Sequence, residues 1–144
     1  MDDRYAAGFF DGEGCVILNK RTLPGSSHSD YNLQVMINNT SLETLERFSR
    51  EYGGKVVKMD NSNPSNGPVA RKQMYRWWIP SSSAVLFLRR IYPFLIEKKS
   101  QVWLALEYRE QISGTNGKRP RVTENEVALR EGYYLALQLE KRAS

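Results

Sequence analysis

The sequence predicts an α+β fold in which helices cover one face of a four-stranded antiparallel sheet. Two observations lead to this prediction. The spacing of apolar residues gives the order helix, strand, strand, helix, strand, strand, and then further helices, and polar, turn-rich stretches separate the two strands of each pair. The length of 144 residues suits one domain, residues 1–144, and leaves no room for a second catalytic domain.

The first half of the chain supplies a short helix and two strands. The helix is expected from Arg4 to Glu13, where aromatic residues recur at helical spacing. The strands are expected at Cys15 to Arg21 and Tyr31 to Asn38, and the second alternates between apolar and polar residues. We therefore expect Leu33, Val35 and Ile37 to face a core, and the opposite, carboxylate-free face to carry Asn32, Gln34, Met36 and Asn38.

The second helix and the second pair of strands follow. Ser41 is a good N-cap for a helix that ends at the glycines 53 and 54. Strands are expected at Lys55 to Asp60 and at Lys72 to Ile79. Both faces of the last strand carry aromatic residues, so its orientation stays open, although Tyr75 and Trp77 suit a core better than a base-stacking role.

The remainder of the chain is predicted to be helical. One helix runs from Ser82 to a break at Pro93, and the C-terminal helices cover about residues 94–143. The last of these opens with Thr123 and Glu126, which form a capping-box pattern, after a polar loop.

Charge and composition limit the class of protein. The net charge of +5 and the pI near 9.4 favour a polyanionic partner. No apolar run is long enough to span a membrane and no secretory signal is visible, so we expect an intracellular protein of a bacterial or phage-infected cytoplasm, or of an organelle. The single cysteine, Cys15, allows no internal disulfide, and the single histidine, His28, makes zinc catalysis a poor fit.

The most specific feature is the segment Ala6-Ala7-Gly8-Phe9-Phe10-Asp11-Gly12-Glu13-Gly14. It resembles the LAGLIDADG motif of homing endonucleases, in the variant that ends Asp-Gly-Glu-Gly. The resemblance extends over nearly the whole chain, through the order of helices and hairpins and through Pro93-Phe94-Leu95 followed by Lys98. It implies an α-β-β-α-β-β-α fold whose sheet binds double-stranded DNA.

The motif also predicts a homodimer. Gly8 and Gly12 lie four residues apart on one helical face, so two copies of the helix can approach backbone to backbone. A second motif would have allowed a pseudo-symmetric monomer, but none follows Gly14. The expected dimer interface consists of Ala7, Gly8, Asp11 and Gly12.

The catalytic residues follow from the same resemblance. A carboxylate at the C-terminal end of a helix is disfavoured by the helix dipole, so Glu13 suggests a compensating cation. The resemblance implies that this cation is a divalent metal, usually Mg²⁺, and that Asp11 supports the motif helices instead. It also implies a basic residue near the active site, Lys98 with Lys99 as its rival, and a polar residue that orders water or phosphate, Asn39 with Asn38 as its rival.

The open face of the sheet should read the DNA. Cys15 and Ile17 share this face with the residues that follow them at alternate positions. Amide side chains can read adenine and arginine can read guanine in the major groove. The predicted DNA contacts are Asn19, Arg21, Asn32, Gln34, Arg71 and Arg76.

Together these features predict a site-specific homing endonuclease, encoded in a mobile intron, that cuts both strands of a long pseudo-palindromic site as a homodimer. The alternative is a catalytically inactive LAGLIDADG protein that acts as an intron RNA maturase or a DNA-binding regulator. Glu13 is still acidic, which favours the enzyme. A basic structural module is a third reading, which would leave the motif unexplained.

Overall fold

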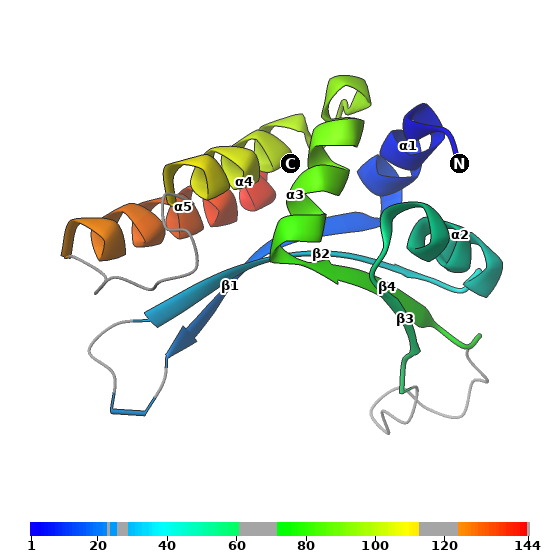
Figure 1. Cartoon of the computed structure of the whole chain (residues 1–144), viewed down its shortest axis with the longest axis horizontal. Coiled ribbons are helices and arrows are strands. Elements are labelled where there is room, and N and C mark those ends of the chain that lie inside the picture. The colour runs from blue at the N-terminus through cyan, green and yellow to red at the C-terminus, as the bar shows by residue number, and fades with distance from the viewer. Residues whose placement is uncertain (23, 26–28, 61–71, 113–123, 144) are drawn as a thin grey trace.

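The computed structural model describes residues 1–22, 24–25, 29–60, 72–112 and 124–143. A four-stranded antiparallel sheet lies under a layer of helices (Figure 1). The elements are α1 (Asp3–Glu13), β1 (Gly14–Thr22), β2 (Ser29–Asn39), α2 (Leu42–Tyr52), β3 (Lys55–Lys58), β4 (Tyr75–Pro80), α3 (Ser81–Ile91), the 3-10 turn η2 (Tyr92–Phe94), α4 (Lys99–Ile112) and α5 (Glu124–Ala143). This arrangement confirms the predicted fold class.

The sheet has the strand order β1-β2-β4-β3, so the two hairpins meet through β2 and β4. In Figure 1 the ends of the strands curve away from the helices, so the free face of the sheet is concave. The alternation predicted for β2 is confirmed, because Leu33, Val35 and Ile37 are buried beneath the helices. The strand orientation that the sequence left open is also decided, since Trp77 and Ile79 are fully buried.

Strand register then assigns the residues of the free face. Arg76 pairs with Asn38, and Trp78 pairs with Met36, so both residues of β4 lie on the side opposite the core. The strand β2 begins at Ser29, two residues earlier than predicted, which adds Asp30 opposite Arg21. The expectation that this face carries no carboxylate is therefore wrong at its outer end.

The helix predicted from residue 94 begins only at Lys99. The carboxylate of Asp11 accepts hydrogen bonds from the backbone N–H groups of Ile96 at 2.7 Å and Lys98 at 2.9 Å. Those N–H groups are thus satisfied outside a helix, and Pro93 sits in the preceding 3-10 turn. A contact from the distant motif helix sets the start of α4, which local spacing could not reveal.

An ionic network fixes the start of α1. Arg90 of α3 pairs with Asp3 and with Glu51 of α2, each at 2.9 Å. Tyr52 donates a hydrogen bond of 2.8 Å to Asp3, and this bond, with help from Arg90, lowers the pKa of the Asp3 carboxyl. Burial and the neighbouring Asp3 carboxylate raise the pKa of the Tyr52 hydroxyl. Three helices are thereby tied together at the N-terminal end of the motif helix.

Candidate nucleic-acid interface

One side of α1 is buried and the other is bare. Ala6, Ala7 and Phe10 have no exposed surface, whereas Gly8 and Gly12 are exposed, and an added Cβ at either glycine would meet nothing within 4 Å. Ala7 therefore packs inside its own chain, and its side chain does not belong to a surface that a second copy could contact. The bare strip of α1 that Gly8 and Gly12 form is here called the glycine face.

Asp11 anchors the segment that carries Lys98. Besides the two backbone contacts of its carboxylate, its own carbonyl oxygen accepts a hydrogen bond from Nζ of Lys98. The ammonium group is thus held at the C-terminal end of α1, where the helix dipole favours a cation. Lys99 turns away, with its Nζ 5.2 Å from the centre of the Tyr92 ring. Of the two rival lysines, only Lys98 contacts the motif helix through a contact that the structure describes.

Glu13 is the last residue of α1 and is exposed. No hydrogen bond or ion pair joins its carboxylate to another residue in the described ranges. The chain turns directly from α1 into β1 at Gly14. The turn brings the backbone so close to the buried Phe10 that an added Cβ would lie 2.1 Å from its Cδ2, so only glycine fits there. This close approach holds the Glu13 carboxylate at the border between the motif helix and the sheet.

The two asparagines that end β2 have different contacts. Asn39 accepts a hydrogen bond of 2.8 Å from the backbone N–H of Ser41, which is the turn-forming role weighed against a functional one. Asn38 accepts a bond of 2.9 Å from Nε of Arg76. Gly14, which follows Glu13, pairs with Ile37, and the neighbouring Asn38 pairs with Arg76.

Arg76 therefore lies at the end of the sheet where β1 begins, directly after Glu13. The position of Arg76 depends on which face of β4 meets the core, and the sequence left that orientation undecided. With Nε fixed by Asn38, the two terminal guanidinium nitrogens remain to meet a ligand. No ion pair joins Arg76 to a carboxylate of the described residues.

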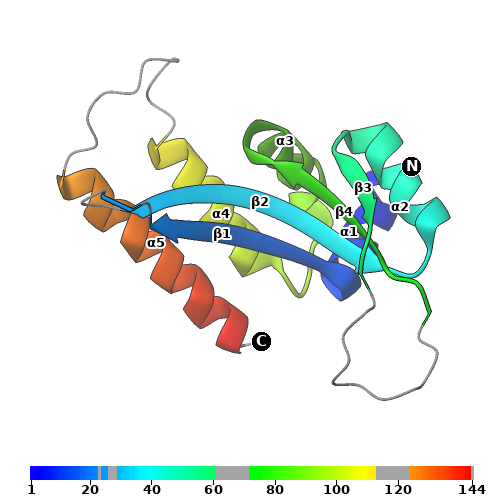
Figure 2. The same ribbon diagram turned by 90° about the horizontal axis from the view of Figure 1, so that it is seen from below.

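The other predicted DNA contacts lie along the two long strands. Asn19 pairs with Asn32, Gln34 pairs with Ile17, and Arg21 pairs with Asp30, all on the free face. Figure 2 shows β1 and β2 running side by side along this face. Arg71 falls outside the described residues, so its position stays a prediction. The sheet therefore brings Asn19, Arg21, Asn32, Gln34 and Arg76 onto one concave surface.

Helix α5 flanks the edge of β1. Lys20 pairs with Glu131 at 2.9 Å, and Tyr31 also donates a hydrogen bond to this carboxylate. The bond from Tyr31, followed by the contacts of Lys20, lowers the pKa of the Glu131 carboxyl. Nζ of Lys141 lies 3.7 Å from Sγ of Cys15. The edge strand is thus covered over much of its length.

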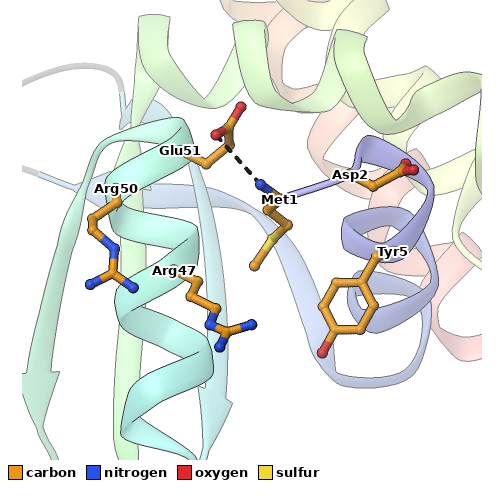
Figure 3. A pocket seen from close by; sticks show the side chains of 6 residues that line it. All are labelled: Met1, Asp2, Tyr5, Arg47, Arg50 and Glu51. Atoms are coloured by element: carbon orange, nitrogen blue, oxygen red, sulfur yellow. Dashed lines mark ion pairs between the residues drawn. The ribbon is translucent and has the colours of Figure 1, made fainter.

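A pocket of about 500 Å³ lies at the opposite end of α1 (Figure 3). The amino group of Met1 lies 3.7 Å from Glu51 across it, and Tyr5, which is 54% exposed, lies at its rim. The lining consists of Met1, Asp2, Tyr5, Arg47, Arg50 and Glu51. None of these was predicted to act in catalysis or in DNA contact. The described residues also contain no group of three or more metal-ligating His, Cys, Asp or Glu side chains.

No protein-family model matches the chain, and no curated protein matches its sequence. Solved structures do match. The homing endonuclease I-CvuI, solved with its target, has a TM-score of 0.74 and 15% identity, over 96% of this chain and 80% of its own. The archaeal intron-encoded homing endonuclease I-Vdi141I, solved with DNA, has a TM-score of 0.74 and 17% identity, over 96% and 82%.

The LAGLIDADG homing endonuclease I-GzeII gives a TM-score of 0.69 and 11% identity over 96% of this chain but only 44% of its own. The chain therefore has the LAGLIDADG homing-endonuclease fold, as its motif predicted. Within the described ranges, no helix is long and apolar enough to cross a membrane.

Proposed function

We propose that this protein is a site-specific homing endonuclease that cuts both strands of a long pseudo-palindromic DNA site as a homodimer. One observation carries the proposal. The exposed glycine face of α1 ends at the exposed carboxylate of Glu13, at the same end of the helix that Lys98 contacts through the Asp11 carbonyl, and at the border of a concave sheet lined with amides and arginines. The mobile intron and the intracellular setting are parts of this proposal.

Two copies joined through Gly8 and Gly12 would bring both Glu13 side chains together on the symmetry axis. The chain covers 80% of I-CvuI but only 44% of I-GzeII, a protein long enough to contain two such units. Asp11 contributes through the support that it gives each α1, and Ala7 contributes from inside the protomer. A single chain would present only half of the catalytic site.

Magnesium is the metal that we propose for this site. Carboxylate oxygens are the donors that Mg²⁺ prefers, and the exposed Glu13 of each protomer fits that requirement. I-CvuI has been solved with DNA in the presence of Ca and of Mg. A bound divalent ion would supply stabilisation of phosphate charge and activation of water.

The remaining groups of the chain orient the phosphate. Lys98, held by Asp11, presents a positive charge where negative charge develops on the phosphate. Asn39 is proposed to order water or phosphate through its Nδ2, because its Oδ1 is occupied by Ser41. Asn38 acts through Arg76, whose free guanidinium nitrogens can meet a phosphate or a guanine.

The free face supplies DNA affinity and sequence selection. Along β2, the distance from Asn38 to Asp30 is about 27 Å at roughly 3.4 Å per residue, which matches about eight base pairs. A dimer would therefore contact on the order of two helical turns. Asn19, Arg21, Asn32 and Gln34 are proposed as base contacts at the outer part of each half-site.

The test is selection from a randomised, partly palindromic DNA library with Mg²⁺. We expect the parent chain to enrich cut sites and the Glu13→Gln variant to bind the same sites without cutting them. The matched control is Glu46→Gln, which changes an exposed carboxylate on α2 and should leave cutting intact. If the parent cuts nothing yet retains selected DNA or intron RNA, the protein is a regulator or a maturase and the endonuclease proposal fails.

A further inference from the structure

The free face of the sheet is not uniformly polar. Register places Cys15, Met36 and Trp78 in one line across β1, β2 and β4. The next line outward holds Ile17 and Pro80 on either side of Gln34. The first line ends at charged groups on both sides, because Nζ of Lys141 lies 3.7 Å from Sγ of Cys15 and Lys55 of β3 pairs with Trp78. The four residues between them are here called the apolar band: Ile17, Met36, Trp78 and Pro80. All are half-buried or exposed, on the side opposite the core.

Polar groups bracket the apolar band on both sides. Toward Glu13 lies Arg76, with its Nε fixed by Asn38. Toward the outer end, Asn19 faces Asn32, whose Oδ1 accepts a hydrogen bond of 2.9 Å from Ser81. A band of apolar groups bracketed by fixed hydrogen-bonding groups matches a ligand that alternates in the same way along its length.

The major groove of DNA is such a ligand. Its edges carry hydrogen-bond donors and acceptors at every base pair, but its apolar groups are the C5-methyl groups of thymine. The concave sheet and the arginines Arg21 and Arg76 favour a duplex as the occupant, because its phosphates are negative and its surface is convex. RNA contains uracil, which lacks this methyl group, and therefore offers the band no equivalent partner.

We propose that the apolar band binds thymine methyl groups in each half-site, which makes Met36, Trp78 and Ile17 determinants of specificity. This inference rests on the proposed function. Alternate residues on a strand are about 6.8 Å apart, or roughly two base pairs. Outward from the cut, the half-site should hold guanine opposite Arg76 and then about four base pairs opposite the band, with thymines at the apolar residues and adenine at Gln34. Adenines should follow opposite Asn32 and Asn19.

The experiment replaces thymine with uracil, one base at a time, in the duplex that library selection recovers. Uracil differs from thymine by the methyl group alone. Binding is measured without divalent metal, so that no cutting occurs. We expect each substitution opposite the band to weaken binding about fourfold, the effect of removing one buried methyl group. Substitutions elsewhere in the half-site should change binding by less than twofold.

Two variants connect the effect to named residues. Met36→Gln exchanges an apolar side chain for an amide of similar length on a face that does not contribute to the core. It should lose the uracil penalty at its own position and select adenine there instead. Asn19→Ala is the matched control on the same face; it should relax selection at the outer end and keep the uracil penalty at the band.

The outcomes separate the two proposals. If the chain selects and cuts a duplex but uracil weakens binding nowhere in the half-site, the inference about the apolar band is wrong and the endonuclease proposal stands. An unchanged uracil penalty in Met36→Gln would also overturn the assignment of that residue. If no duplex is selected at all, the proposed function fails and the inference fails with it.

Discussion

Replacing Gly8 with leucine tests the proposed dimer through the feature that most clearly lacks an explanation within one chain. Glycine in the interior of a helix costs about 1 kcal/mol relative to alanine or leucine. In α1 both Gly8 and Gly12 lie within the helix, and neither has another atom within 4 Å of an added Cβ. The two glycines therefore lower the helix stability of one protomer by about 2 kcal/mol, and no close packing within that protomer compensates for the loss.

The Gly8→Leu variant should consequently fold at least as well as the parent. Its side chain, however, would lie between two copies of α1 and force them to the usual interaxial distance of about 8–10 Å. A displacement of about 1 Å in a catalytic group can lower the rate on the order of 100-fold. We therefore expect weaker dimerisation and a loss of cutting of at least about 100-fold.

The measurements are sedimentation equilibrium, cutting of the selected site and urea unfolding. The matched control is Gly132→Leu, because Gly132 is an exposed glycine in α5 that also has nothing within 4 Å of an added Cβ. It should raise the free energy of unfolding by about 1 kcal/mol and leave dimerisation intact. The reasoning is refuted if Gly8→Leu dimerises and cuts like the parent, or if both variants lose dimerisation equally.

Three further predictions concern the contacts at the C-terminal end of α1 and at the edge of β1. Gly14→Ala should lower the free energy of unfolding by about 1–3 kcal/mol in urea, because the new Cβ would overlap the ring of Phe10. Asp11→Asn should lower it by a similar 1–3 kcal/mol, about the value of a charged hydrogen bond, and should slow cutting through Lys98. Glu131→Gln should reduce the free energy of unfolding at neutral pH only. The pKa of the Glu131 carboxyl in the folded protein lies below its ordinary 4.5, so the ionised carboxylate contributes fully to stability above pH 4.5. That contribution is lost as the pH falls through the folded pKa.

Each of these predictions has a contrary result. Gly14→Ala should contrast with Gly12→Ala, and equal stability of the two variants would contradict the close approach at Phe10. Unchanged cutting by Asp11→Asn would mean that the position of Lys98 does not depend on that carboxylate. For Glu131→Gln, a stability difference from the parent that persists undiminished to pH 2 would contradict the ionic role of Glu131.

Local patterns predicted most of the elements because they depend on contacts between near neighbours. The alternation of Leu33, Val35 and Ile37 set the core face of β2, and Ser41 set the start of α2. The motif predicted the fold, while the residues that it implies around Glu13 stay a prediction. Lys98 was placed by resemblance alone, and the structure brings it to the motif helix.

Patterns failed where distant segments decide the outcome. The start of α4 depends on Asp11, 85 residues from Ile96, and no local signal records that hydrogen bond. The orientation of β4 depends on which aromatic ring the helices can enclose, and its sequence offered rings on both faces. Ala7 looked like an interface residue because small residues suit close packing, but the fold uses it within the chain.

The sequence by itself determined the motif, the fold class and most of the secondary structure, because these depend on residue identity and on spacing along the chain. Only the tertiary structure decided which side chains share the free face, that Arg76 lies at the end of the sheet where β1 begins, and that an apolar band divides the polar groups. The physical reason is register. A shift of one residue between strands moves every side chain to the other face, and the packing of the whole core, rather than any one strand, fixes that register.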